Sequence, residues 1–136
     1  MDTTQDTTQE VADAASTETR DARRLAVGRI VRQGDVYIAR QADMHPVGTD
    51  RRGDQVATGT SVGARHIVVG GGAEVWSWPT GSWTSPYVSD WARGPMVAAA
   101  GEWTLTHPEH ADVLFSAGRY GVIYQQDPRR AAAVLD

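Results

Sequence analysis

The residues best suited to chemistry lie close together in the run His107-Pro108-Glu109-His110. Imidazole nitrogens and a carboxylate are ligands that suit Zn, Fe, Mn, Ni or Cu. Proline favours a turn, so His107 and His110 could face one pocket, and His66 on a neighbouring strand would supply a third nitrogen. Glu109 would be a further ligand or a general base. The structural alternative is a pair of surface-turn histidines, because a His-x-x-His spacing often arises by chance.

Aromatic residues form the second group of candidates. The five tryptophans are Trp76, Trp78, Trp83, Trp91 and Trp103. An exposed aromatic stripe would suit stacking on a sugar, a base or a partner protein. Core packing is the alternative, and we expect it for Trp103 and for one of Trp76 and Trp78. Trp83, Tyr87 and Trp91 lie in or beside a loop rich in Ser, Thr, Gly and Pro, so we expect them to contact a partner.

Other short motifs carry less information. Arg51, Arg52 and Arg65 could form a phosphate patch, but the interspersed acids argue against it. Arg52-Gly53-Asp54 spells an adhesion tripeptide, for which a solvated turn is the simpler interpretation. Gly70-Gly71-Gly72 lacks the Lys-Ser/Thr of a phosphate-binding loop, and the Gly-x-Ser-x-Gly of serine hydrolases is absent. The sequence therefore predicts neither a nucleotide-binding loop nor a serine nucleophile.

The elements that would position these residues are short strands. Runs of β-branched and aromatic residues at regular spacing predict one β domain over residues 25–127, an antiparallel sandwich or small barrel. The run Pro95–Ala100 could be a buried strand or a short helix. Val113–Phe115 and Tyr120–Tyr124, joined by Ser116-Ala117-Gly118, are predicted to form the last hairpin. Pro128 could open a short helical turn over residues 128–136.

The overall composition narrows the class of protein. The chain has 136 residues, enough for one domain, and 40% of them are hydrophobic. There is no cysteine, which excludes disulfides, zinc-thiolate sites and thiol nucleophiles. The net charge of -4 argues against general nucleic-acid binding. The polar N-terminus is not a secretory signal, and no apolar run could span a membrane, so we expect synthesis in the cytoplasm.

Residues 1–24 form a separate compositional unit. Asp-Thr-Thr-Gln occurs at 2–5 and again at 6–9, and five acids precede the first base, Arg20. Large apolar residues are almost absent, so we expect this acidic tail to be disordered alone and to gain order on a partner. Arg20, Arg23 and Arg24 would contact that partner.

Three groups of residues carry a resemblance to other proteins. They are Arg32-Gln33-Gly34-Asp35-Val36; then Gly59, Gly63 and His66; and finally His107, Glu109, His110, Gly118 and Tyr120. The chain resembles small uncharacterised bacterial and phage proteins that share this pattern over about residues 30–126. The resemblance implies no activity. Ala64 stands where the pattern has a histidine, so a metal site in that family would have lost a ligand here. The closing residues are also similar to a cupin strand pair, although the cupin His-x-His motif is missing.

Two functions are consistent with these observations. The first is a noncatalytic structural or interaction module of a larger assembly, such as a decoration or accessory protein of a phage particle or related shell. It would need no cofactor, and its partners would be protein subunits in a homo- or hetero-oligomer, with no membrane. The second is a metal-dependent, cupin-like β-barrel enzyme or sensor, in which a divalent transition metal binds His66, His107, His110 and Glu109. We prefer the first because of Ala64 and the acidic tail.

Overall fold

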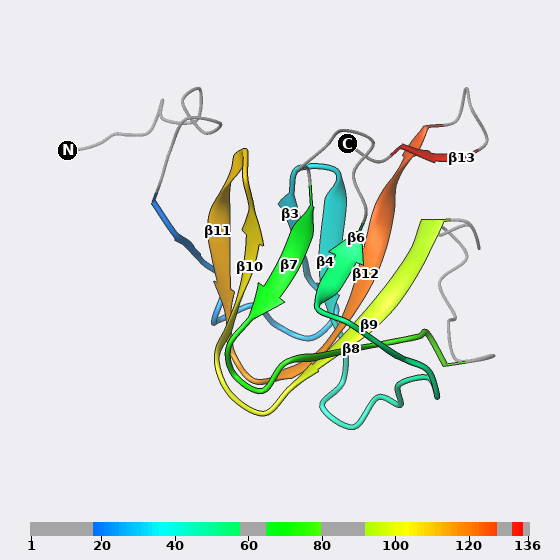
Figure 1. The fold of residues 1–136 in the computed structure, drawn as a ribbon. Helices are drawn as coiled ribbons and strands as arrows, with labels where there is room; N and C mark the ends of the chain where they lie inside the picture. Colours follow the sequence, from blue (N-terminus) through cyan, green and yellow to red (C-terminus); the bar gives the residue numbers. More distant parts are fainter. Residues whose placement is uncertain (1–17, 58–64, 80–91, 128–131, 135–136) are drawn as a thin grey trace.

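Two β-sheets face each other and form a sandwich (Figure 1). The computed structural model describes residues 18–57, 65–79, 92–127 and 132–134, and in these ranges the chain forms strands and no helix. The predicted all-β sandwich is therefore confirmed. No helix in the described part of the chain is long and apolar enough to cross a membrane.

The first sheet has five strands and supplies the three histidines discussed below. In spatial order its strands are β2 (Arg20–Asp21), β11 (His110–Phe115), β10 (Trp103–His107), β7 (His66–Val69) and β6 (Gln55–Ala57). Strand β2 runs parallel to β11, and the other neighbours are antiparallel.

The second sheet has seven strands and is built around the longest one. Its order is β3 (Ile30–Gln33), β4 (Val36–Arg40), β12 (Gly118–Asp127), β9 (Arg93–Ala99), β8 (Glu74–Trp76) and β5 (Arg51–Arg52), with β13 (Ala132–Val134) pairing β12. The run that could have been a helix or a strand is thus strand β9, between β12 and β8.

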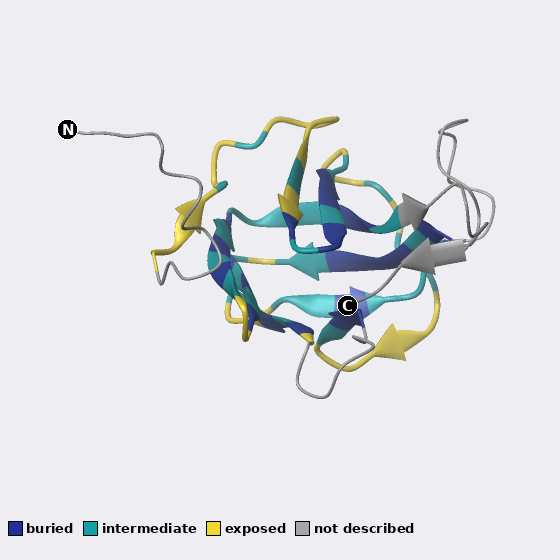
Figure 2. Cartoon of the chain, turned by 90° about the horizontal axis from the view of Figure 1, so that it is seen from above, coloured by how far each residue is buried: buried dark blue, intermediate teal, exposed yellow. Residues whose placement is uncertain are grey.

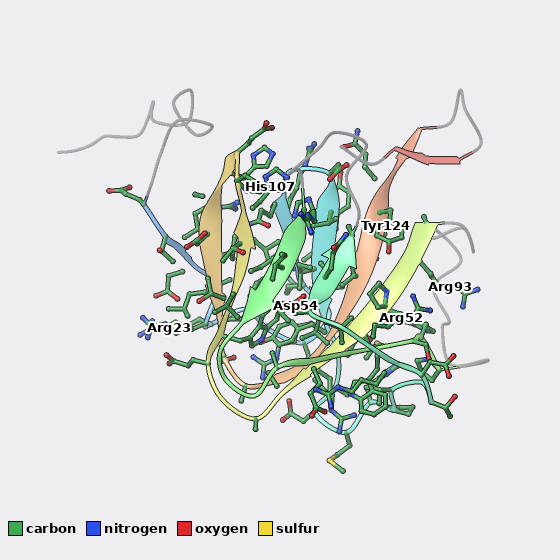
Figure 3. All side chains as sticks on the ribbon, in the orientation of Figure 1. Arg23, Arg52, Asp54, Arg93, His107 and Tyr124 are labelled. Atoms are coloured by element: carbon green, nitrogen blue, oxygen red, sulfur yellow. The ribbon has the colours of Figure 1, made fainter. Side chains whose placement is uncertain are left out.

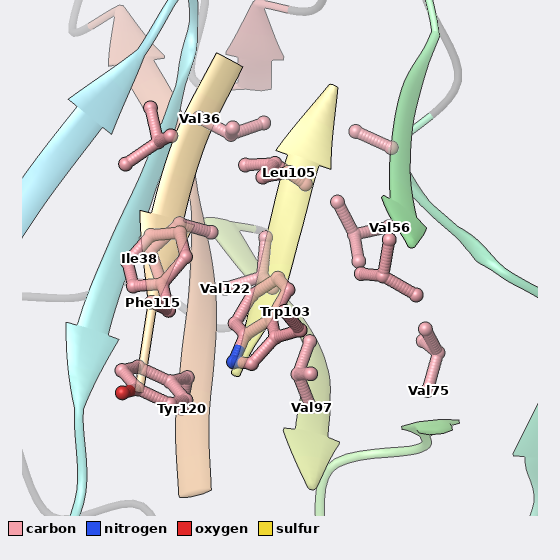
Figure 4. Close-up of a cluster of buried hydrophobic side chains, with 13 residues drawn as sticks. Val36, Ile38, Val56, Val75, Val97, Trp103, Leu105, Phe115, Tyr120 and Val122 are labelled. Carbon is pink, nitrogen blue, oxygen red and sulfur yellow. The ribbon is translucent and has the colours of Figure 1, made fainter. Parts of the chain in front are cut away.

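The core lies between the two sheets, and Figure 2 shows buried stretches on strands of both. In β10 and β11 every second residue is buried, as expected for strands that present one face to a core. Trp103 is its largest member. Its ring stacks on Phe115 with centroids 4.5 Å apart and meets the edge of Tyr120 at 5.4 Å (Figure 4). All three side chains are fully buried, so the prediction that Trp103 is a core residue is confirmed.

The outer face of the seven-stranded sheet carries a second, smaller apolar layer. Trp78 lies over Gly121 of β12, where a methyl group on the glycine would come within 2.6 Å of the indole ring. Trp76 is half-buried and donates a hydrogen bond from its indole to Glu74 at 3.2 Å. Neither tryptophan is a core residue; Val75, which points the other way, is the buried position of β8.

The predicted last hairpin is wrong. Strand β11 belongs to the first sheet and β12 to the second, so Ser116 and Ala117 carry the chain from one sheet to the other. The Tyr120 hydroxyl fastens this crossing, because it donates a hydrogen bond to the Ser116 carbonyl at 2.9 Å. Burying Phe115 and Tyr120 from opposite sheets against the same tryptophan requires a crossing rather than a hairpin. The real hairpin is β10–β11.

Both ends of the described chain differ from the predicted domain boundaries. Residues 1–17 lie outside the described part, but Arg20–Asp21 already pair with β11, and Leu25 packs against the core. At the other end, Ala132–Val134 form strand β13 on Gln125–Asp127 instead of the predicted helical turn. A free strand edge offers backbone hydrogen bonds that outweigh the helical preference of alanine.

Candidate functional site

Three histidines and the β3–β4 turn meet at one end of the sandwich. The ring centroid of His107 lies 4.3 Å from that of His66 and 4.6 Å from that of His110 (Figure 3). The turn supplies Gln33 and Asp35, which both contact the ring of His66. We call these five residues the histidine cluster. The sequence prediction that the three histidines converge is thus matched by their positions.

Two tight turns bring the histidine cluster together. In the β3–β4 turn, Gly34 has a φ of +59°, a conformation that other residues adopt only with strain. A methyl group at residue 34 would also lie 2.8 Å from the His110 ring, so glycine allows the close approach. In the β10–β11 turn, His107 pairs with His110, and Pro108 and Glu109 lie between them.

Gln33 ties three strands to the turn. Its side-chain nitrogen donates hydrogen bonds to the Leu105 carbonyl at 2.8 Å and to the Ala111 carbonyl at 2.9 Å. Because two carbonyls accept from this atom, it must be the amide nitrogen, and the amide oxygen must face His66. That oxygen lies 2.9 Å from His66 Nδ1, so the His66 Nδ1 carries a proton and donates it.

The other nitrogen of His66 faces a carboxylate. His66 Nε2 lies 3.2 Å from Asp35 Oδ1. Since Nδ1 already holds its proton, this contact is a full hydrogen bond only when the pair takes up one more proton. Burial is the main cause that lowers the pKa of His66 to about 4, with help from His107 and His110 and against the pull of Asp35. At neutral pH the imidazole is therefore neutral, and the contact with Asp35 contributes little stability.

Four residues of the histidine cluster are buried, and the fifth, His110, is half-buried. Gln33 and His66 are 1% exposed, Asp35 is 2% exposed and His107 is 6% exposed. The ring nitrogen Nδ1 of His107 accepts a hydrogen bond from the Glu109 backbone N–H at 3.0 Å. The hydrogen bonds of the buried cluster residues are thus made to other protein groups, on neighbouring strands.

Comparison with known proteins places this cluster in a family. A family model described as a domain of unknown function, DUF8820, matches residues 32–125. The chain belongs to the DUF8820 family. No curated protein and no solved structure shows significant similarity to it. The resemblance to an uncharacterised family is thereby confirmed at the level of the family, and the matched range contains all five residues of the histidine cluster.

The predicted metal ligands of the DUF8820 domain do not form a metal site as they stand. Within the described residues, no group of three or more His, Asp or Glu side chains is placed to hold a metal ion. Both nitrogens of His66 face protein atoms, and Nδ1 of His107 accepts from the backbone. Glu109 is exposed, and the contact described for it is made by its backbone and not by its carboxylate.

The predicted partner residues fall into two groups. Trp83, Tyr87 and Trp91 lie outside the described residues, as do Gly59, Gly63 and Ala64. The three N-terminal arginines are described, and two of them, Arg20 and Arg23, contact the domain itself. Arg20 donates a hydrogen bond to the Arg32 carbonyl at 2.7 Å. Arg23 forms ion pairs with Asp21 at 2.9 Å and Glu102 at 3.4 Å, and its hydrogen bonds lower the pKa of Asp21 to about 2. Arg24 lies beside the same acids.

Gln33 and Asp35 are the cluster residues that sequence reasoning missed as site residues. They were noted only as part of the run Arg32–Val36, which carried the resemblance. The available signal was an amide and a carboxylate flanking a glycine in a predicted turn. A side chain beside such a turn can fold back onto a neighbouring strand, and here both contact His66.

Proposed function

We propose that this DUF8820 chain is a noncatalytic structural or interaction module of a larger assembly. More specifically, we propose that it is a decoration or accessory protein of a phage or shell-like particle. The observation that carries the proposal is the burial of the centre of the histidine cluster. Its central residues Gln33, Asp35 and His66 are 2% exposed or less. A substrate could not reach these three side chains in this arrangement of the strands, whereas catalytic groups normally line an accessible cleft.

The hydrogen bonds of the cluster connect strands of both sheets to one another. Gln33 alone joins the β3–β4 turn to β10 and β11 through two buried backbone carbonyls. Buried hydrogen bonds of this kind fix the relative position of the elements that they join. This supports a rigid module whose work is done at its surface.

The outer edge of β3 beside Ile30 is the surface that best suits a protein partner, since Arg20 already occupies the Arg32 carbonyl farther along the strand. β3 is the last strand on its side of the seven-stranded sheet. Ile30 is 54% exposed on this edge, and Val27 just before it is 57% exposed. Edge strands with exposed apolar residues readily pair with another chain. We therefore assign the contact surface to Val27 and Ile30.

The N-terminal segment shows the kind of contact that an assembly would use. Arg20–Asp21 add a short parallel strand to the edge of β11, and the Ala22 N–H donates to the Leu114 carbonyl at 2.7 Å. Leu25 follows and packs against the core. The described residues 20–25 thus pair with their own domain, and we propose that the same kind of pairing occurs between subunits.

Sedimentation velocity of the full chain tests this proposal. We expect reversible association between about 1 µM and about 1 mM, and a shift toward monomer in Ile30→Lys because a lysine on the edge blocks strand pairing. Met44→Lys is the matched control, since Met44 is 85% exposed in the loop after β4 and is not part of strand β3. The proposal fails if the chain stays monomeric throughout, or if both variants behave like the wild type.

A second candidate is the metal-dependent enzyme or sensor, favoured by the short distances between the three imidazole rings. Opening of the turn would free nitrogens of His66 and His107 for a metal. Elemental analysis of protein purified without chelator distinguishes the two candidates. One metal ion per chain that is lost in His107→Ala and kept in His45→Ala would favour this function over the first.

A further inference from the structure

The charges of this chain are divided unevenly between its first 17 residues and the rest. Residues 1–17 contain four acids and no arginine, whereas residues 18–136 contain 13 acids and 13 arginines, so the first segment carries the whole net charge of -4. Residues 20–32, which follow almost directly, contain five arginines and one acid. We call these five arginines the basic side; they are Arg20, Arg23, Arg24, Arg29 and Arg32. Two stretches of opposite charge thus lie next to each other in the sequence.

The basic side lies where the edges of the two sheets meet. Strand β2 is the last strand of the five-stranded sheet, and β3 is the last strand of the seven-stranded sheet. The Arg20 guanidinium joins these two edges, because it donates a hydrogen bond to the Arg32 carbonyl at 2.7 Å. Arg23 and Arg24 follow β2, and Arg29 immediately precedes β3. All five arginines are exposed, so they are accessible to another segment.

The positive charge of the basic side is only partly compensated by described residues. The acids Asp21 and Glu102 both pair with Arg23. Arg29 and Arg32 form no ion pair with any acid in the described ranges. The contacts of the Arg32 guanidinium are with a carbonyl, a side-chain amide and an aromatic ring, which are all neutral. An acidic segment placed here would therefore be attracted by charges that the described residues leave uncompensated.

The backbone of β3 is also open on this side. The Arg40 N–H donates to the Arg29 carbonyl at 3.0 Å, so alternate residues starting from Arg29 form the hydrogen bonds to β4. The N–H and C=O groups of Ile30 and Arg32 therefore point away from β4, in agreement with the hydrogen bond from Arg20 to the Arg32 carbonyl. Within the described ranges, no strand lies beyond β3. Natural proteins often cover such an edge with a further part of the chain.

We propose that residues 1–17 of the same chain bind along the edge of β3, with their acids beside the arginines of the basic side. The first eight residues include four threonines, which favour an extended strand. Seventeen extended residues span up to about 56 Å, whereas the four residues of β3 span about 13 Å. The segment is thus long enough to turn back and cover the edge from its attachment beside β2.

The segment of the same chain is favoured over that of a second copy. Only residues 18 and 19 separate it from β2. A segment tethered so closely is present at an effective concentration in the millimolar range, which a second copy reaches only in concentrated solution. The contact does not require the assembly role proposed above. If the chain does assemble through Ile30, this segment would cover the edge until a partner displaces it.

Paramagnetic NMR of the full chain tests this contact. The chain has no cysteine, so Thr8→Cys gives a single attachment point for a nitroxide spin label within the segment. At low ionic strength we expect a selective loss of amide signal from Val27–Arg32 and none from Glu74–Trp76, which lie in β8 near the other edge of the sheet. Salt should abolish the loss, because the Debye length falls from about 30 Å at 0.01 M to about 3 Å at 1 M.

Charge-neutral variants of the spin-labelled chain locate the contact. Neutralising the segment removes the attraction without changing the described part of the chain, and should restore the signals of Val27–Arg32. The substitutions are Asp2→Asn, Asp6→Asn, Glu10→Gln and Asp13→Asn. Arg24→Gln combined with Arg29→Gln should have the same effect. Arg51→Gln combined with Arg52→Gln removes the same charge from β5, at the opposite edge of the sheet, and should leave the signal loss unchanged. All four of these arginines are exposed, so none is needed for the core.

Three results would overturn the proposal. The first is no selective signal loss at low ionic strength. The second is an equal effect of the two arginine pairs, which would mean a non-specific attraction of charge. The third is a signal loss that grows with protein concentration and appears in isotope-labelled chains without a spin label when these are mixed with spin-labelled chains, because it would assign the segment to a second copy. Contact within one chain should be independent of concentration. These results do not depend on the sedimentation experiment, so the two proposals can fail separately.

Discussion

Replacing Gln33 by methionine should destabilise the protein severely, although the two side chains have similar length and shape. Gln33 donates to the carbonyls of Leu105 and Ala111 and accepts from Nδ1 of His66. The side chain is 1% exposed, so water cannot easily replace it. Methionine would leave two carbonyls and one ring N–H facing a thioether.

The size of the effect can be estimated from these three groups. A buried polar group without a partner costs about 1–3 kcal/mol, so three cost about 3–9 kcal/mol. The thioether is more favourably buried than an amide, which offsets about 1–2 kcal/mol. We therefore expect the free energy of unfolding to fall by about 4 kcal/mol, a large share of the about 5–15 kcal/mol typical of a domain.

Urea unfolding at pH 7.5, followed by tryptophan fluorescence, measures this loss directly. Gln125→Met is the matched control, since Gln125 is half-buried and its side chain accepts one long hydrogen bond, 3.3 Å, from Arg32. It should cost less than about 1 kcal/mol. If Gln33→Met is no more destabilising than this control, the buried cluster does not fasten the turn to the sheets, and the main support for the proposed function is lost.

Two further predictions concern acid stability and the glycine turn. Burial holds the pKa of His66 near 4, below its ordinary 6.5, so its contribution is fully present above pH 6.5 and is lost as the pH falls toward 4. In urea titrations, the free energy of unfolding of the wild type should fall by up to about 3 kcal/mol more than that of His66→Asn across this window. A rise in this free energy on acidification would contradict the prediction, because it would mean that the folded His66–Asp35 pair binds a proton more tightly than the unfolded chain does. Gly71 and Gly72 have φ of +63° and +62°, but a methyl group at 71 would lie 2.3 Å from the Glu102 carbonyl oxygen, whereas at 72 the nearest atom is 3.9 Å away. Both alanine variants should reduce the free energy of unfolding by about 1 kcal/mol because of the positive φ, and Gly71→Ala should reduce it by about 2 kcal/mol more because of the clash. Equal losses of stability in thermal unfolding would contradict the packing argument.

The sequence was sufficient for the fold class, because strand periodicity is a local signal. The alternation in Trp103–His107 and the mixed pattern of Arg93–Ala99 depend only on which face each residue buries. The crossing at Ser116 was not predictable in the same way. A short polar connection between two strands looks the same whether the strands pair or lie in opposite sheets, and only the shared contact with Trp103 decides between them.

The histidines of the candidate site were predictable from the sequence, but the residue that connects them to other strands was not. Histidine draws attention by its chemistry, so His66, His107 and His110 were found from the sequence. Gln33 is chemically unremarkable, and its importance comes from acceptors 72 and 78 residues away along the chain.

The two limits of the matched domain lie next to each other in the fold. The first and last matched residues, Arg32 and Gln125, touch each other, with Nη2 of Arg32 3.3 Å from Oε1 of Gln125. The Gln125 N–H also donates to the Asp35 carbonyl at 2.8 Å. The family domain therefore closes on itself beside the histidine cluster. Strands β2 and β13 lie outside the matched range, and each extends a sheet by pairing with a strand of the domain.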